Sequence, residues 1–302
     1  MNILKKGLLV LVALAAIFAV FAFTQLRSLE VEKLSDDLYV IRGIGGNTTV
    51  LKTDAGAVVI DSMTFVMQGK LISSKVLELT GSKPSLLINT HYHLDHTHGN
   101  PGFELGIRII STDNTLSHLT TLDSEFWQGD KAKLLPNETF SDRQTLVVGH
   151  KKLQLIHPGR GHTNGDLVVL IEDEETMVMG DLLFNQSYPN IDLEAGGSVQ
   201  EWSTTLDNVL QSKFVQVIPG HGATTDRLGI NNFQRFTGQL AKLAIAAAAD
   251  EISLKEFLQS SSLNADKNFV PLKIAGISLG LDREFVLRRA WQEATGNFER
   301  KN

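Results

Sequence analysis

Short apolar runs separated by turn residues begin the globular part of the chain. Leu38–Arg42, Thr48–Thr53 and Val58–Asp61 are rich in residues that favour β-strands. Gly45-Gly46 and Asp54-Ala55-Gly56, which lie between these runs, are typical turn sequences. The pattern therefore predicts an antiparallel meander at the start of the fold.

The spacing of apolar residues then changes. Between Val66 and Leu79 they recur closer to every 3.6 than every 2 residues, and Gly81 stands just past the end, so an amphipathic helix is predicted. Ser85–Asn89 follows as a continuous apolar run of the kind found in buried strands. This strand leads directly into a histidine-rich segment.

The second half of the chain repeats this organisation more loosely. Strands are predicted at Thr145–Val148, Lys152–His157, Leu167–Ile171, Thr176–Met179 and Phe214–Ile218, with a helix near Ser203–Gln211 before the last strand. Because strands open each half and each half closes with a helix and a strand, we predict an α/β fold with two facing sheets and helices outside.

The last quarter of the chain is predicted to be helical. Leu240–Ala249 is rich in alanine, and a further helix is expected near Glu284–Ala294. The chain contains no internal repeat of short period and no linker rich in Pro, Gly or Ser. We therefore predict one domain over residues 27–228 and a helical C-terminal extension over residues 229–302 that packs on it.

The N-terminus has the pattern of an export segment. Lys5 and Lys6 precede an uncharged, mostly apolar stretch from Gly7 to Leu26, and the next charge is Arg27. The stretch is also long enough for a marginal membrane span. Residues 1–26 are therefore predicted to be a signal peptide or an N-terminal membrane anchor, with the remainder periplasmic or facing outside the cytoplasm.

Composition narrows the function classes. The 302 residues are 42% hydrophobic and 21% charged, which is the profile of a packed globular protein. The net charge of −6 argues against non-specific nucleic-acid binding, and the predicted partner is a small-molecule substrate. Because the chain has no Cys, any metal site or nucleophile must use His, Asp, Glu, Ser or water.

One segment concentrates residues that bind metals. It runs His91-Tyr92-His93-Leu94-Asp95-His96, directly after the predicted buried strand. In an extended or turn conformation alternate residues project the same way, so His91 and His93 can reach one ion while Asp95 and His96 turn toward a second. Four residues of this kind within six positions seldom have a purely structural role.

Three more candidate ligands stand where predicted strands meet glycine-rich loops. His162 lies in a polar loop just before a strand, Asp181 follows the strand that ends at Met179, and His221 follows the strand that ends at Ile218. Such junctions often carry sites that a rigid scaffold holds in place. Together with the histidine-rich segment they make seven candidate ligands, enough for two metal ions.

The ordered motifs H-x-H-x-D-H, G-H-T, G-D and P-G-H-G resemble those of the metallo-β-lactamase superfamily, over about Leu29 to Thr225. The resemblance implies a four-layer αββα sandwich with a metal pair at one edge of the two sheets. It also implies that Asp61 accepts a hydrogen bond from a ligand imidazole, with a turn or helix-capping role as the equal alternative. The implied ligands are His91, His93 and His162 for the first metal, Asp95, His96 and His221 for the second, and Asp181 as the bridge.

The mechanism expected for such a pair follows from charge. Two divalent ions that share one water lower its pKa toward neutrality and so provide hydroxide at pH 7, while one ion polarises the substrate oxygen. Asp95 would hold the proton of that water, and Asp95 and Asp181 are the predicted catalytic carboxylates. Two Zn²⁺ per chain are expected because imidazole-rich sites suit zinc, with iron or manganese as alternatives.

The resemblance leaves the substrate open. Asp181 stands where some β-lactamases of the superfamily have a Cys ligand, so a hydrolase of a lactone, lactam or ester is favoured, with β-lactamase-like activity as a minority outcome. The alternative is a non-hydrolytic metal-binding accessory protein of a periplasmic redox system, of the quinoprotein or sulfur-oxidation type. Residues considered for supporting roles are His98 near the ligands, Phe184, Asn185 and Tyr188 along a pocket, Phe126 and Trp127 at the end of a lid helix, and Arg160 toward a substrate carboxylate.

Overall fold

The computed structural model describes residue 11, residues 24–274 and residues 276–298. Most of the predicted export segment, residues 1–26, lies outside these described residues. Within the described part of the chain, no helix is both long enough and apolar enough to span a bilayer.

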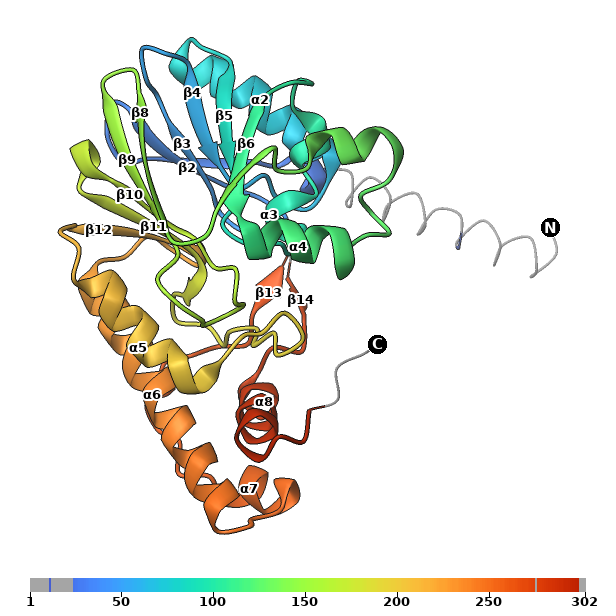
Figure 1. The fold of residues 1–302 in the computed structure, drawn as a ribbon, viewed down its shortest axis with the longest axis vertical. Coiled ribbons are helices and arrows are strands. Elements are labelled where there is room, and N and C mark those ends of the chain that lie inside the picture. The colour runs from blue at the N-terminus through green and yellow to red at the C-terminus, as the bar shows by residue number, and fades with distance from the viewer. Residues whose placement is uncertain (1–10, 12–23, 275, 299–302) are drawn as a thin grey trace.

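The first sheet has seven strands in sequential order (Figure 1). Its first four strands pair antiparallel, which is the predicted meander, and the pairs from the fourth strand onward are parallel. Helix α2 (Val66–Thr80) connects the fourth and fifth strands and ends at Gly81, which has φ 74°. The strands are β1 (Glu30–Lys33), β2 (Leu38–Arg42), β3 (Thr48–Leu51), β4 (Ala57–Ile60), β5 (Pro84–Ile88), β6 (Arg108–Thr112) and β7 (Glu138–Phe140).

The second sheet has five strands in the order β12-β11-β10-β9-β8. Its pairs are antiparallel except β11 with β12, which is parallel because helix α5 (Val199–Leu210) crosses over between these two strands. The strands are β8 (Arg143–Val148), β9 (Lys151–Ile156), β10 (Val168–Ile171), β11 (Thr176–Phe184) and β12 (Gln216–His221).

Alternating side chains make three apolar layers. Residues such as Val40 and Ile88 of the first sheet pack against Leu155 and Val169 of the second, which forms the core between the sheets. The other face of the first sheet is covered by α2, with Ile72 among its buried residues. This arrangement confirms the predicted αββα sandwich.

The outer face of the second sheet is covered by α5 and the C-terminal helices (Figure 1). Trp202 of α5 and Phe233 and Phe236 of α6 are fully buried there. The remaining helices are α6 (Arg227–Ala249), α7 (Leu254–Ser260) and α8 (Arg283–Thr295). The helical C-terminal part is therefore present as predicted.

Several elements were absent from the sequence prediction or differ from it. Strand β11 continues beyond Met179 to Phe184, so Asp181 lies inside a strand and not in the loop after it. Helix α4 ends at Thr121, so Phe126 and Trp127 lie in the turns that follow it, and the predicted lid helix ending there was wrong. The elements not predicted include β1, β6, β7, α4 (Asp113–Thr121) and the hairpin β13 (Lys273–Ile274) and β14 (Ile277–Ser278). The segment after β5, expected to be extended or a turn, forms the short helix α3 (Leu94–Thr97) in its last part.

Candidate metal centre

All seven predicted ligands converge at one edge of the two sheets. The histidine-rich segment follows β5, and its last part forms the short helix α3 (Leu94–Thr97), which carries Asp95 and His96. His162 lies in the loop between β9 and β10, Asp181 lies within β11, and His221 is the last residue of β12. Segments as far apart in sequence as residues 91 and 221 therefore meet because both sheets end here.

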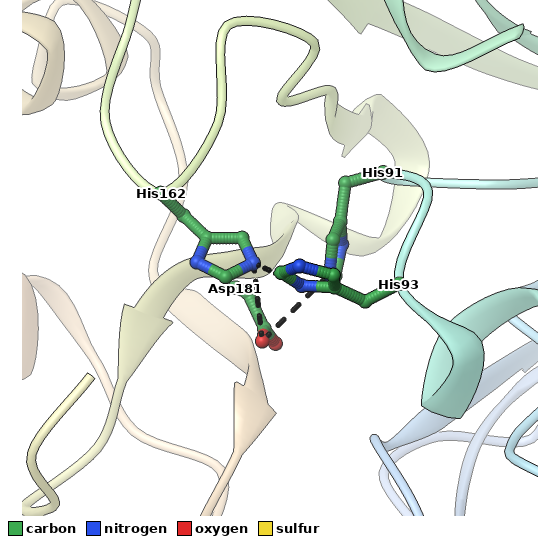
Figure 2. A group of neighbouring side chains, drawn as sticks. All are labelled: His91, His93, His162 and Asp181. Atoms are coloured by element: carbon green, nitrogen blue, oxygen red, sulfur yellow. Dashed lines mark hydrogen bonds and ion pairs between the residues drawn. The ribbon is translucent and has the colours of Figure 1, made fainter. Parts of the chain in front are cut away.

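The seven side chains form two groups. In each group, one potential ligand atom per residue lies within 4.8 Å of every other. Figure 2 shows the side chains of the first group pointing toward one another. The first group contains His91, His93, His162 and Asp181, and the second group contains Asp95, His96 and His221.

Asp181 faces both groups with different oxygens. Its Oδ2 lies 3.8 Å from His91 Nε2 and 3.6 Å from His162 Nε2. Its Oδ1 lies 3.1 Å from His96 Nε2 and 3.4 Å from His221 Nε2. One carboxylate oxygen toward each group is the arrangement that a bridging ligand requires.

Two glycines allow this close packing. A Cβ on Gly46, in the turn before β3, would collide with the His96 ring. A Cβ on Gly220 would collide with Asp181 Oδ1. The Gly45-Gly46 pair and the P-G-H-G motif thus have a steric reason in addition to their role in turns.

The partner of His96 is the predicted Asp61. His96 Nδ1 donates to Asp61 Oδ2 at 2.7 Å, and the same carboxylate accepts from the Thr90 amide and hydroxyl at 2.8 and 2.7 Å. Asp61 does not cap α2, whose N-cap is Phe65. The structure therefore shows the role that the resemblance implied, which directs His96 Nε2 toward the site.

Asp192 is an equivalent partner that sequence reasoning missed. His93 Nε2 donates to Asp192 Oδ2 at 2.9 Å, and the Tyr92 hydroxyl donates to the same oxygen at 2.5 Å. The other oxygen accepts from the amides of Glu194 and Ala195. Asp192 lies in an irregular loop 99 residues away from His93, and no local motif marks it.

The remaining two imidazoles of the first group are also fixed. His162 Nδ1 donates to the Asn190 carbonyl at 2.9 Å. His91 Nδ1 lies 3.1 Å from the Thr90 hydroxyl, and since that hydroxyl donates to Asp61, His91 must be the donor. In each case the proton sits on the nitrogen away from the site, and the facing nitrogen presents a lone pair.

These lone pairs fit a cation. His93 Nδ1 and His162 Nε2 face each other at 2.7 Å. His91 Nε2, His96 Nε2 and Asp181 Oδ1 are buried without a hydrogen-bond partner, a situation that costs about 1–3 kcal/mol per group. A set of imidazole nitrogens and carboxylate oxygens that converge in this way suits a divalent transition metal such as zinc. The residues present therefore fit the metal that the fold family implies.

Burial and neighbouring charges shift the pKa values of the histidines in opposite directions. Burial lowers the pKa of His162 to about 4 and that of His91 well below its ordinary value, so both are neutral at pH 7, the form that binds metals. Burial would also lower the pKa of His221, but the charges of Asp181 and Asp95 outweigh it and raise that pKa to about 9. In the absence of metal, protons on His96 and His221 balance the negative charges of Asp95 and Asp181.

A cavity of about 590 Å³ opens onto this site. His93, Asp95, Asp181 and His221 line it, which places ligands from both groups beside a space large enough for a small molecule. Phe184 lines it as predicted.

The other residues considered for supporting roles lie elsewhere. Tyr188 is buried and donates to Asp266, and Asn185 lines a different cavity. Arg160 pairs with Glu201 at 2.7 Å and is not among the lining residues. His98 pairs with Asp123 at 2.8 Å and is in neither ligand group.

Comparison with known proteins defines the class. The family model described as the metallo-beta-lactamase superfamily matches residues 41–221, more than half of the chain. The chain therefore belongs to this superfamily. Membership confirms the predicted class of the protein, a metal-dependent hydrolase.

The names of the curated relatives are more specific than the name of the superfamily. The chain is 27% identical over 215 residues to a protein named metallo-beta-lactamase type 2 from Elizabethkingia meningoseptica, covering 67% of this chain and 82% of that one. It is 28% identical over 189 residues to a protein of the same name from Bacillus cereus, covering 61% and 70%.

Solved structures share the fold. A metallo-beta-lactamase from Pontibacter korlensis superposes with a TM-score of 0.61 at 20% identity and covers 70% of this chain and 99% of its own. A stereoselective inverting sec-alkylsulfatase from Pseudomonas sp. reaches a TM-score of 0.72 at 14% identity, covering 89% of this chain and 51% of its own. A match over 89% of this chain must include part of residues 229–302, so that fold resemblance extends into the C-terminal helices.

Proposed function

We propose that this protein is an exported hydrolase that uses two zinc ions to cleave the acyl C–O or C–N bond of a lactone, lactam or ester. The observation that carries the proposal is the position of Asp181, whose two oxygens face separate ligand groups at the edge of a cavity. A structural carboxylate would not need to be shared in this way beside an accessible space.

The ligand groups define which residues would hold the metals. Bound there, a zinc pair lowers the pKa of a water molecule toward neutrality and polarises the oxygen of the substrate carbonyl. One ion would be held by His91, His93, His162 and Asp181, and the other by Asp95, His96, His221 and Asp181.

Asp95 is the carboxylate placed to move a proton. It lines the cavity, and its side chain is 17% exposed, whereas that of Asp181 is 4% exposed. Burial would raise the pKa of Asp95, but the neighbouring His96 and His221 hold it well below its ordinary value. Asp95 is therefore ionised at pH 7 and can accept the proton of the attacking water, then pass it to the leaving group.

Phe184 belongs to the wall of the cavity and packs against a proposed ligand. Its ring stacks on His221 with ring centroids 5.3 Å apart, and the side chain is 1% exposed. This contact helps to hold the imidazole in place.

The cavity favours an uncharged substrate over a β-lactam antibiotic. Among the residues that the structure describes, no Lys or Arg lines it. β-Lactam antibiotics carry a carboxylate apart from the bond that is cleaved, and no cationic side chain of this lining is available to pair with it. β-Lactam hydrolysis therefore stays the minority outcome, although the curated relatives bear that name.

A substrate panel tests the proposal. Zinc-loaded protein would be offered a lactone, an activated ester, a thioester, a cephalosporin, a phosphodiester and, because of the sulfatase with the same fold, a sec-alkyl sulfate. We expect turnover of the lactone or ester that is lost with EDTA and restored by zinc. A matched control is His150→Ala, which removes an exposed imidazole paired with Asp54 and should change nothing.

Failure would take two forms. Turnover of the sulfate or the phosphodiester alone would replace the carbonyl chemistry. Turnover of none, with zinc bound, would contradict the hydrolase proposal and favour the accessory-protein alternative.

Export is tested separately. Expression of the full chain in a Gram-negative bacterium should place it in the periplasmic or membrane fraction, because Lys5 and Lys6 precede an apolar stretch. Removal of residues 1–26 should leave the protein in the cytoplasm. An unchanged distribution would contradict export.

A further inference from the structure

Away from the ligands, the cavity wall is made mostly of apolar side chains. Ile44 comes from the turn between β2 and β3, Phe65 from the residue before α2, and Leu94 from the start of α3. Phe65 and Leu94 are 43% and 50% exposed. These three residues thus bring apolar surface from the first half of the chain to the cavity.

Further apolar lining residues come from the C-terminal part of the chain. Leu272, Ile277 and Leu279, in and around the hairpin β13–β14, line the same cavity. Ile277 and Leu279 are 68% and 49% exposed. In Figure 1 this hairpin lies beside the sheet edge that carries α3, although it is outside residues 41–221, which the family model matches. The hairpin therefore lies outside the part of the chain that the family model matches.

The exposed apolar side chains surround an active-site cavity and do not lie scattered over the surface. Contiguous exposed apolar surface of this kind usually marks a binding site for an apolar ligand or partner. Asp95 and Asp181 line the same cavity, so a ligand bound to its apolar wall lies near the two ligand groups.

Charged groups lie to one side of this cavity. Arg42 and Lys273 line a neighbouring cavity of about 440 Å³ that shares His221 and Leu272 with the first. Arg42 is already paired with Glu32 at 2.6 Å. An anionic substituent would be directed there, because the described lining of the main cavity contains no Lys or Arg side chain.

We propose that the main cavity binds an uncharged alkyl or acyl chain attached to the bond that is cleaved, and that Ile277 and Leu279 of the β13–β14 hairpin contact this chain. This inference rests on the proposed hydrolase function, because the chain is placed by its attachment to the reacting carbonyl. It names the substrate class as a medium-chain acyl ester or an alkyl-substituted lactone.

The first experiment is a chain-length series. With p-nitrophenyl esters from acetate to decanoate, kcat/KM of the zinc-loaded protein should rise about three- to fourfold per buried methylene until the cavity is full. Ile277→Ser and Leu279→Ser should each reduce the octanoate-to-acetate ratio of kcat/KM at least about threefold. The control Val215→Ser removes an equally exposed apolar side chain from the residue before β12, at the strand end remote from His221, and should keep the ratio.

The second experiment does not depend on turnover. Nile red bound to the metal-free protein should be displaced by n-alkanols with an affinity that increases from butanol to decanol. Ile277→Ser should weaken decanol binding more than butanol binding, and Val215→Ser should change neither.

The outcomes separate the two proposals. Alkanol affinity that rises with chain length, without hydrolysis of any ester, would support the apolar site and contradict the carbonyl hydrolase. Ester hydrolysis independent of chain length, together with alkanol affinity independent of chain length, would overturn the apolar site and leave the hydrolase in place.

Discussion

The two ligand groups are held in different ways. In the first group three imidazoles come from loops, and each has its remaining nitrogen bonded to a different kind of oxygen: a hydroxyl, a carboxylate and a backbone carbonyl. In the second group Asp95 and His96 lie on α3 and His221 ends β12, so regular elements position the ligands. The carboxylate of Asp61 bonds directly to His96, and it reaches His91 of the first group through the Thr90 hydroxyl.

This difference shows how the two halves of the chain depend on each other. His93 belongs to the first half, but Asp192 of the second half fixes its orientation. The segment that carries Asp192 ends at the N-terminus of α5, where Glu293 of α8 accepts from the Ser198 hydroxyl and the Val199 amide at 2.5 and 2.7 Å. The C-terminal helices therefore brace the first group, although they supply no ligand to it.

Replacement of the shared ligand should have the largest effect. Asp181→Ala removes the oxygens that face both groups. We expect the rate of hydrolysis to fall more than about 100-fold, which exceeds the usual effect of losing a residue that only hydrogen-bonds to a ligand. The zinc content should fall in both groups. The measurement is zinc analysis together with ester turnover. Retention of two zinc ions by this variant would refute the bridging role.

Single-group variants test whether the groups bind metal independently. His93→Ala should impair the first group and His221→Ala the second, each leaving about one zinc per chain after dialysis. The second-group ion should also be removed first by a chelator in the native protein, because that group offers fewer imidazoles. Simultaneous loss of both ions in a chelator titration would contradict this distinction.

The outer carboxylates should have a smaller effect. Asp192→Asn and Asp61→Asn keep the shape of the side chain but weaken the hydrogen bond to a ligand imidazole, so each should lower zinc affinity about 10–100-fold. Competition with a chromophoric chelator measures this. Asp192→Asn should affect the first ion and Asp61→Asn the second; the reverse assignment would show that the groups are not separately supported.

The smallest effect concerns the free energy of unfolding and arises from Asp166, in the loop that carries His162. Burial raises the pKa of Asp166 from 3.8 to about 7, against the hydrogen bonds donated by Thr163. The folded state thus holds a proton that the unfolded state has lost, so this residue makes stability of the metal-free protein fall as pH rises from about 4 to 7.

Asp166→Asn should remove this contribution. Denaturant unfolding with EDTA present should then show a smaller decrease in the free energy of unfolding between pH 4 and pH 7 than in the parent protein. An unchanged pH dependence would mean that Asp166 stays ionised.

The ligands were predictable from sequence because their signals are local. Four of the seven lie within six residues, His162 stands in a short glycine-containing motif of the loop between β9 and β10, and His221 stands in such a motif at the end of β12. Asp181 was predicted as a ligand but placed outside its strand, because Gly180 looks like a strand end. In the structure Gly180 takes φ 51° and the register shifts there, yet the strand continues.

The partners and the cavity wall were less predictable. Asp192 reaches His93 only through the path of an irregular loop, and that path depends on packing against distant elements. The β13–β14 hairpin has two residues per strand, too few to show an alternating pattern. Side chains that meet through tertiary packing alone leave no signal in the spacing of residues.

The most direct test is a crystal structure of the zinc-soaked protein with anomalous diffraction recorded at the zinc edge. We predict two peaks, one about 2.0–2.1 Å from the facing nitrogens of His91, His93 and His162 and the other at similar distances from His96 and His221, with Asp181 between them. A single peak, or peaks away from Asp181 in a protein that still hydrolyses the ester, would contradict the account.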